Sequence, residues 1–87
     1  MEEIIDVSGL EPPEPLERIL DALADLRQGD HLRVKHRRDP VPLYQMLRDM
    51  GYEWATTQLA PGRFEIVIWP SDMPSPLSSQ EQGDLKP

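Results

Sequence analysis

The sequence predicts an α/β fold, a two-layer α/β sandwich in which two helices cover one face of a four-stranded mixed sheet. Two segments carry apolar residues at helical spacing, shorter segments carry the apolar runs or the alternation typical of strands, and proline or glycine marks most junctions. The predicted order is β-α-β-α-β-β. Right-handed crossovers after the first two strands then place both helices on the same side of the sheet.

A short strand and an amphipathic helix account for the N-terminal part of the chain. The strand is an apolar run that stops at Ser8 and Gly9. Pro15 suits the first turn of the following helix, where a missing N–H group leaves no bond unmade, and Gly29 is expected to end that helix in a left-handed conformation. The apolar face of the helix comprises Leu16, Ile19, Leu20, Leu23 and Leu26.

The second strand and the second helix follow the same plan. The segment "HLRVKH" alternates between apolar and polar residues, which predicts a strand with one buried face. Asp39 is expected to cap the second helix, which has Pro40 and Pro42 in its first turn and is closed by Gly51. The buried face of the strand comprises Leu32, Val34 and His36.

The segments "YEWATTQLA" and "RFEIVIWP" are predicted to be two strands joined by a tight turn at "PG". The first of them lacks a decisive alternation, so Trp54 belongs either to the core or to the surface. In the last strand one face carries Phe64, Ile66 and Ile68, and the other carries Glu65, Val67 and Trp69.

Composition limits both the size of the folded part and the kinds of partner. The 87 residues indicate one small domain over residues 1–70, and the Ser-, Pro- and Gln-rich residues 71–87 indicate a disordered tail. The net charge of −7 argues against nucleic acid and anionic membranes as partners. The N-terminus "MEEIIDV" has no export signal and no apolar run approaches the roughly 18 residues of a membrane span, so we expect a cytoplasmic, bacterial-style protein.

Two loops are expected to meet at one edge of the sheet, because the first two strands are parallel and each leads into a helix. Ligands of open α/β sheets favour this carboxyl edge. The residues predicted to form a ligand- or partner-binding site there are Glu11, Pro12, Pro13 and Glu14 from one loop, and His36, Arg37, Arg38 and Asp39 from the other.

The segment "GLEPPEPLERIL" resembles the Gly-Leu-X-Cys-Pro-X-Pro opening of the TusA/SirA-like sulfur carriers, with matches at Gly9, Leu10, Pro13 and Pro15. Over residues 4–69, including "GDHLRVKHRRDPVPLYQML", the chain is more similar to a sister group of bacterial domains known as domain of unknown function 2249. The resemblance implies a TusA-like fold and an accessory role beside iron-binding or redox proteins. It does not extend to persulfide chemistry, because the cysteine position of the motif is Pro12 and the chain contains no cysteine.

The sequence therefore predicts a non-catalytic binding domain that recognises a partner protein or a small anion at the loop edge. Arg37 and Arg38 would supply donors to an anion. We expect no catalytic residue, no metal site and no cofactor, since no catalytic or phosphate-binding motif is present.

Two alternatives remain at this stage. The first is a metal- or redox-linked accessory protein or enzyme centred on His36, although the only other histidine, His31, belongs to the opposite face of the strand. The second is a module that forms a homodimer through the open face of the sheet. That interface would comprise Arg33, Lys35, Val67 and Trp69.

Overall fold

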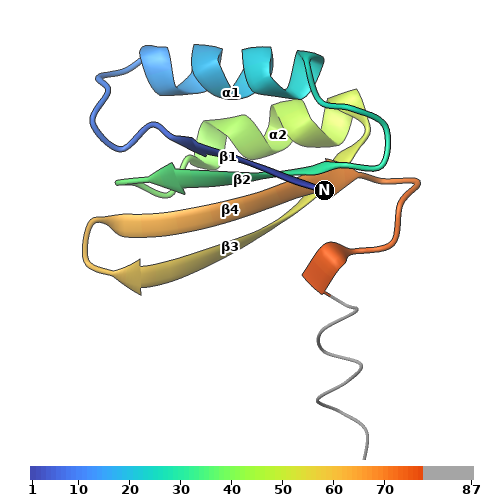
Figure 1. Ribbon diagram of the computed structural model, residues 1–87. Coiled ribbons are helices and arrows are strands. Elements are labelled where there is room, and N and C mark those ends of the chain that lie inside the picture. The colour runs from blue at the N-terminus through green and yellow to red at the C-terminus, as the bar shows by residue number, and fades with distance from the viewer. Residues whose placement is uncertain (78–87) are drawn as a thin grey trace, which may run out of the picture.

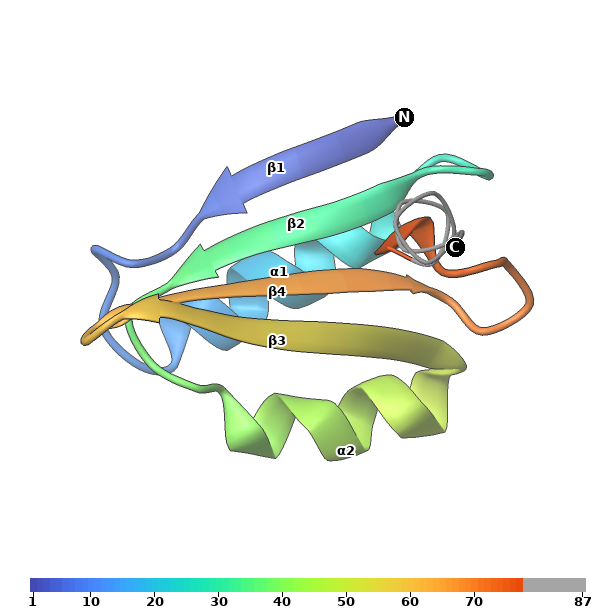
Figure 2. The same cartoon turned by 90° about the horizontal axis from the view of Figure 1, so that it is seen from below.

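The computed structural model describes residues 1–77 and confirms the predicted α/β sandwich. Both helices lie on one face of the four-stranded sheet (Figure 1). The strand order is β1-β2-β4-β3, with β1 parallel to β2 and the other two pairs antiparallel (Figure 2). The elements are β1 (Glu2–Asp6), α1 (Glu14–Ala24), β2 (His31–His36), α2 (Val41–Met50), β3 (Tyr52–Ala60) and β4 (Arg63–Pro70).

The core lies between the helices and the sheet, where the apolar faces of both layers meet. Burial of each large aliphatic side chain stabilises the fold by about 1.5–3 kcal/mol. The predicted inward face of β2 is confirmed, since Leu32 and Val34 have no exposed surface and His36 is 8% exposed. The buried core cluster comprises Val7, Ile19, Leu23, Leu32, Val34, Leu43, Leu47, Ile66 and Ile68.

The first helix ends earlier than the sequence predicted. It stops at Ala24, and the N–H of Asp25 closes it by donating to the carbonyl of Asp21 at 3.2 Å. Gly29 has the expected positive φ of 91° but serves a separate turn, in which the N–H of Asp30 donates to the carbonyl of Arg27 at 3.0 Å. The left-handed glycine was correctly identified, but it turns the chain into β2 and does not end the helix.

The second helix begins without the predicted side-chain cap. Pro40 occupies the capping position, and the Asp39 carboxylate instead accepts a hydrogen bond from the Tyr44 hydroxyl. Burial, followed by this bond to Asp39, raises the pKa of Tyr44 to about 12. Gly51 closes the helix as predicted, with φ of 88° and its N–H directed at the carbonyls of Leu47 and Arg48.

The open face of the sheet differs from the expected interface. Val67 and Trp69 lie on this face as predicted but are only 4% and 5% exposed, and the chain after β4 turns back beneath the sheet (Figure 1). The turn is held at Ser71, whose N–H and hydroxyl both donate to the carbonyl of Gly51. The expectation that these two apolar side chains are available to a second copy is therefore corrected.

The other two residues of that predicted interface are polar and differ in their contacts. Arg33 donates to Glu2 and Glu65, at 2.8 Å in each case, and so joins β1, β2 and β4. Lys35 is exposed. Trp54, which the sequence left undecided, packs on the helix-covered side, where its ring stacks on Tyr44 at a centroid distance of 5.1 Å.

Part of the predicted tail is described. The structure describes residues 71–77 of the predicted tail. Residues 78–87, which complete that tail, lie outside the described residues. Within residues 1–77, no helix is long and apolar enough to span a membrane.

Candidate functional site

The loops after β1 and β2 meet at one edge of the sheet because these strands are parallel. Asp6 pairs with Lys35 at the end of both strands, and the N–H of Val7 donates to the carbonyl of Lys35 at 2.9 Å. The β3–β4 turn reaches the same edge, since Phe64 pairs with His36. Figure 1 shows the three connections gathered at its left-hand side.

A groove with a volume of about 260 Å³ lies between the opening turns of α1 and α2, where both helices leave this edge. Of its nine lining residues five are prolines, and His36 is the only polar one. Proline rings are rigid, so the walls are preorganised and lose little conformational entropy when the groove is filled. The lining comprises Pro12, Pro13, Pro15, Leu16, Ile19, His36, Pro40, Pro42 and Leu43.

The prolines also change what the two helix N-termini can bind. An anion at a helix N-terminus is held by free backbone N–H groups of the first turn. In α1, Pro15 has no such group, and the N–H groups of Glu14 and Glu17 already donate to carbonyls of the preceding loop. In α2, Pro42 has none, and the N–H groups of Val41 and Leu43 are also bonded. This chemistry favours an apolar occupant over a small anion.

His36 forms the polar part of the groove. Its Nδ1 accepts the backbone N–H of Arg38 at 3.1 Å. Burial, followed by the charges of Arg37 and Arg38, lowers the pKa of His36 and so favours the neutral ring. With Nδ1 as acceptor, the ring proton is on Nε2, which has no partner within residues 1–77. Every fully buried side-chain nitrogen in that range has a hydrogen-bond partner. Because Nε2 has none, it must keep some contact with solvent, and it is a free donor.

The pKa of His36 predicts a loss of stability in mild acid. Because the folded pKa lies below the ordinary value of 6.5, the unfolded chain takes up the proton first as the pH falls. The stability that His36 contributes is complete above pH 6.5 and is lost as the pH falls through the folded pKa. Urea unfolding between about pH 7 and pH 5 should show a falling free energy of unfolding, and a shallower fall for His36→Asn.

Acidic side chains change the stability of the fold at a lower pH than His36 does, so their effect can be separated from that of His36. Burial raises the pKa of Glu2, but the hydrogen bonds from Arg33 and His31 outweigh it and lower the pKa below its ordinary value of 4.5. The stability from Glu2 is therefore lost only below about that pH. If the wild type and His36→Asn show equal slopes above pH 5, the neutral state of His36 is not what the fold requires.

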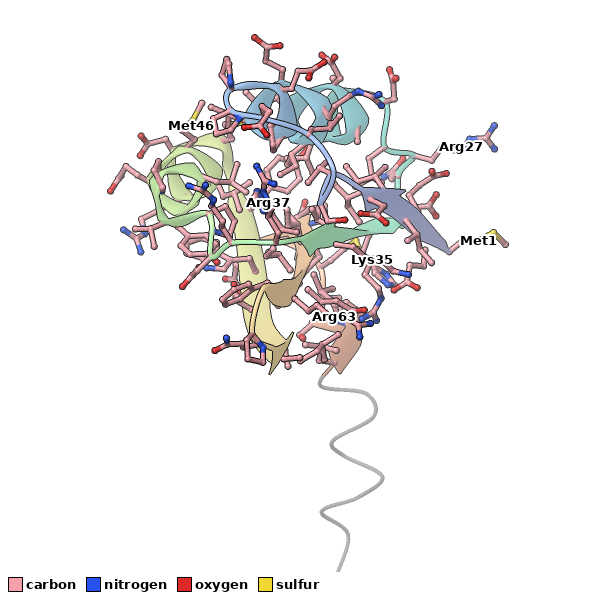
Figure 3. All side chains as sticks on the ribbon, turned by 90° about the vertical axis from the view of Figure 1, so that its left-hand side faces the viewer. Met1, Arg27, Lys35, Arg37, Met46 and Arg63 are labelled. Carbon is pink, nitrogen blue, oxygen red and sulfur yellow. The ribbon has the colours of Figure 1, made fainter. Side chains whose placement is uncertain are left out.

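Charged side chains of both signs lie around the groove at this edge. Nη2 of Arg37 lies 3.3 Å from Oε2 of Glu11 and links the two loops, although Glu11 is 81% exposed and such a pair contributes only about 0.2–1 kcal/mol. The side chain of Arg38 is exposed and makes no ion pair within residues 1–77. Lys35 and Arg63 line a second hollow of about 240 Å³, which also reaches His36. Figure 3 views the molecule from this end.

The structure brings together some of the eight predicted site residues and separates others. Pro12, Pro13 and His36 line the groove, whereas Glu11 and Arg37 join the loops. Glu14 is exposed as the first residue of α1, Arg38 binds His36 through its backbone, and Asp39 is directed to Tyr44. The sequence reasoning missed the groove-lining roles of Pro15, Leu16, Ile19, Pro40, Pro42 and Leu43.

A metal site centred on His36 has no set of ligands in the described part of the chain. Within residues 1–77 no group of three His, Cys, Asp or Glu side chains is placed to hold a metal ion. The second histidine, His31, lies at the start of β2 and bonds Glu2 at 3.0 Å. His36 is therefore better placed as a hydrogen-bond donor than as a ligand.

The fold and the groove define a small two-layer α/β domain with a preformed apolar site at the carboxyl edge of its parallel strands. Residues 4–70 match the model of a family described as an uncharacterized conserved protein, DUF2249, and the chain belongs to this family. No curated protein and no solved structure matches the chain.

Proposed function

We propose that this chain is a non-catalytic binding domain that takes a segment of a partner protein into the groove between α1 and α2. The groove itself carries the proposal, since a preformed hollow with apolar walls and one free donor is typical of a recognition site. Its volume of about 260 Å³ accommodates one large side chain of a partner rather than a whole cofactor.

The composition of the chain supports a binding role over catalysis. The loop resembles that of the TusA-like sulfur carriers, but Pro12 stands at the cysteine position and no thiol exists anywhere in the sequence. The same loop now supplies Pro12 and Pro13 to the groove wall. We therefore propose that a TusA-like scaffold serves here as an accessory domain in the bacterial cytoplasm, with recognition in place of persulfide transfer.

The other functions considered from the sequence have weaker support. A small anion would find few free N–H groups at the helix N-termini, although Arg38 remains available to it. A metal- or redox-linked role lacks a ligand set around His36 within residues 1–77. A homodimer through the open face would have to form without Val67 and Trp69, which are covered.

Site-specific photo-cross-linking in the native cells tests the proposal. The cross-linking amino acid p-benzoylphenylalanine is placed at position 14, in place of the exposed Glu14 between two groove prolines, or at position 25, in place of Asp25 just after the other end of α1. We expect a discrete protein adduct from position 14 and none from position 25. Equal adducts from both positions, or none from position 14, would rule out a partner at the groove.

A further inference from the structure

We infer that the groove selects a tyrosine side chain within an acidic segment of the partner. This inference rests on the proposed function and specifies the chemistry of the occupant. It follows from three features of the site: the shape of the apolar walls, the free Nε2–H of His36, and the unpaired positive charge of Arg38 at the rim.

The walls favour an aromatic ring. The five prolines contribute from both loops and both helix openings, and Leu16, Ile19 and Leu43 complete the apolar surface. An aromatic side chain offers large contact area at low entropic cost, because it has only two rotatable bonds. A volume of about 260 Å³ suits one such ring.

The donor of His36 selects among aromatic residues. Its ring is 8% exposed, Nδ1 is used by the N–H of Arg38, and Nε2–H needs an acceptor once an occupant displaces water. A tyrosine hydroxyl accepts this bond. Phenylalanine would leave the donor buried and unpaired, and tryptophan has a donor of its own at the ring nitrogen, so neither satisfies Nε2–H.

The charge of the rim selects the residues beside the tyrosine. The whole protein has a net charge of −7, so an acidic segment needs a local positive group in order to bind. At the groove edge, the exposed side chain of Arg38 has no ion-pair partner within residues 1–77. Lys35 and Arg63 lie in the neighbouring hollow, which Asp6 and Glu65 also line. A carboxylate next to the tyrosine would reach Arg38 and form a charge-assisted hydrogen bond.

Short peptides test this specificity by NMR titration of the full-length labelled protein. The probes are blocked heptapeptides with the centre Glu-Tyr-Glu, Glu-Phe-Glu or Lys-Tyr-Lys, the outer residues being glycine and serine. We expect the Glu-Tyr-Glu probe to shift amide signals of the groove residues and to bind roughly fivefold more tightly than Glu-Phe-Glu. The Lys-Tyr-Lys probe should bind more weakly than either.

Two matched pairs of variants assign the effects to residues. His36→Asn keeps an acceptor near the Arg38 N–H but removes the outer donor, whereas His36→Gln keeps a donor near the Nε2 position. We expect His36→Asn to abolish the preference for tyrosine over phenylalanine and His36→Gln to preserve part of it. Arg38→Gln should weaken binding of Glu-Tyr-Glu severalfold, while Arg27→Gln, which removes an exposed charge beyond the other end of α1, should not.

The outcomes separate this inference from the proposed function. Equal affinity for tyrosine and phenylalanine probes, an unchanged preference in His36→Asn, or no binding at the highest soluble concentration would each overturn the specificity. The cross-linking at position 14 is independent of these probes. An adduct there together with a failed peptide titration would retain the binding domain and reject the acidic tyrosine segment as its ligand.

Discussion

Pro42→Glu is expected to weaken binding of the partner at the groove at least tenfold while leaving the fold intact. Pro42 is exposed in the first turn of α2 and lines the groove. A glutamate there places a carboxylate beside an apolar occupant. Binding would then either remove water from this charge, which costs free energy, or leave the groove only partly filled. Tenfold corresponds to about 1.4 kcal/mol, well within the cost of burying a poorly paired polar group.

The stability of Pro42→Glu should change little, because two effects of similar size oppose each other. Loss of the proline ring costs about 0.4–1 kcal/mol through the entropy of the unfolded chain. An acidic residue in the first turn stabilises a helix by about 0.3–1 kcal/mol, and α2 has none there. Equal urea midpoints for the variant and the wild type would verify this.

Val41→Glu is the matched control. Val41 lies one position earlier in the same helical turn, is 61% exposed and does not line the groove. It receives the same charge in the same helix-dipole environment. We expect the cross-link from position 14 to persist in Val41→Glu and to be lost in Pro42→Glu. Loss in both variants would point to a general effect of negative charge, and loss in neither would mean that the partner does not enter the groove.

The order of the elements and the meeting of two loops could be predicted from the sequence because both depend on local patterns. Leu32, Val34 and His36 alternate over one strand, and this spacing alone places His36 at the end of the covered face. Parallel pairing of the first two strands then brings the loops after them together without any knowledge of side-chain contacts.

The groove could not be predicted in the same way, because it depends on how two helix openings face each other. Pro15 and Pro42 were each assigned to a helix start on local grounds. That both also line one hollow follows from the packing of α1 and α2 on the sheet, which no periodicity encodes. A signal was present, however, since four prolines stand in or just before the first turns of the two helices, at positions 13, 15, 40 and 42.

The errors arose where two local solutions compete for one residue. Asp39 precedes a helix and has the side chain of a good cap, yet Tyr44 offers its hydroxyl to the same carboxylate. Gly29 has the left-handed conformation of a helix-ending glycine, yet the helix already ends at Ala24, before the chain reaches Gly29. The cap predicted at Asp39 was wrong because the hydrogen bond from Tyr44 uses its carboxylate, and the helix end predicted at Gly29 was wrong because the connection to β2 begins after Ala24.

Burial on the face of the sheet opposite the helices makes Trp69 the site of the largest expected loss of stability. Its side chain is 5% exposed although it points away from the helices, and the backbone there pairs Trp69 with Glu53 of β3. Removal of a buried tryptophan side chain costs about 3–5 kcal/mol, whereas domains of this size have only roughly 0.05–0.15 kcal/mol of stability per residue. Trp69→Ala should therefore lose a large part of the stability of the domain and unfold at a much lower urea concentration than the wild type.

Trp54→Ala is the comparison, because it removes the same side chain from a half-buried position. Trp54 stacks on Tyr44 and lies 5.6 Å beneath the guanidinium of Arg48, so its loss removes an aromatic pair of about 0.5–1.5 kcal/mol and part of the buried area. Urea unfolding followed by far-ultraviolet circular dichroism should show a much smaller loss than in Trp69→Ala. Equal losses would mean that Trp69 contributes no more than the half-buried Trp54. A folded, stable Trp69→Ala would restore the open face as a surface that a second copy could use.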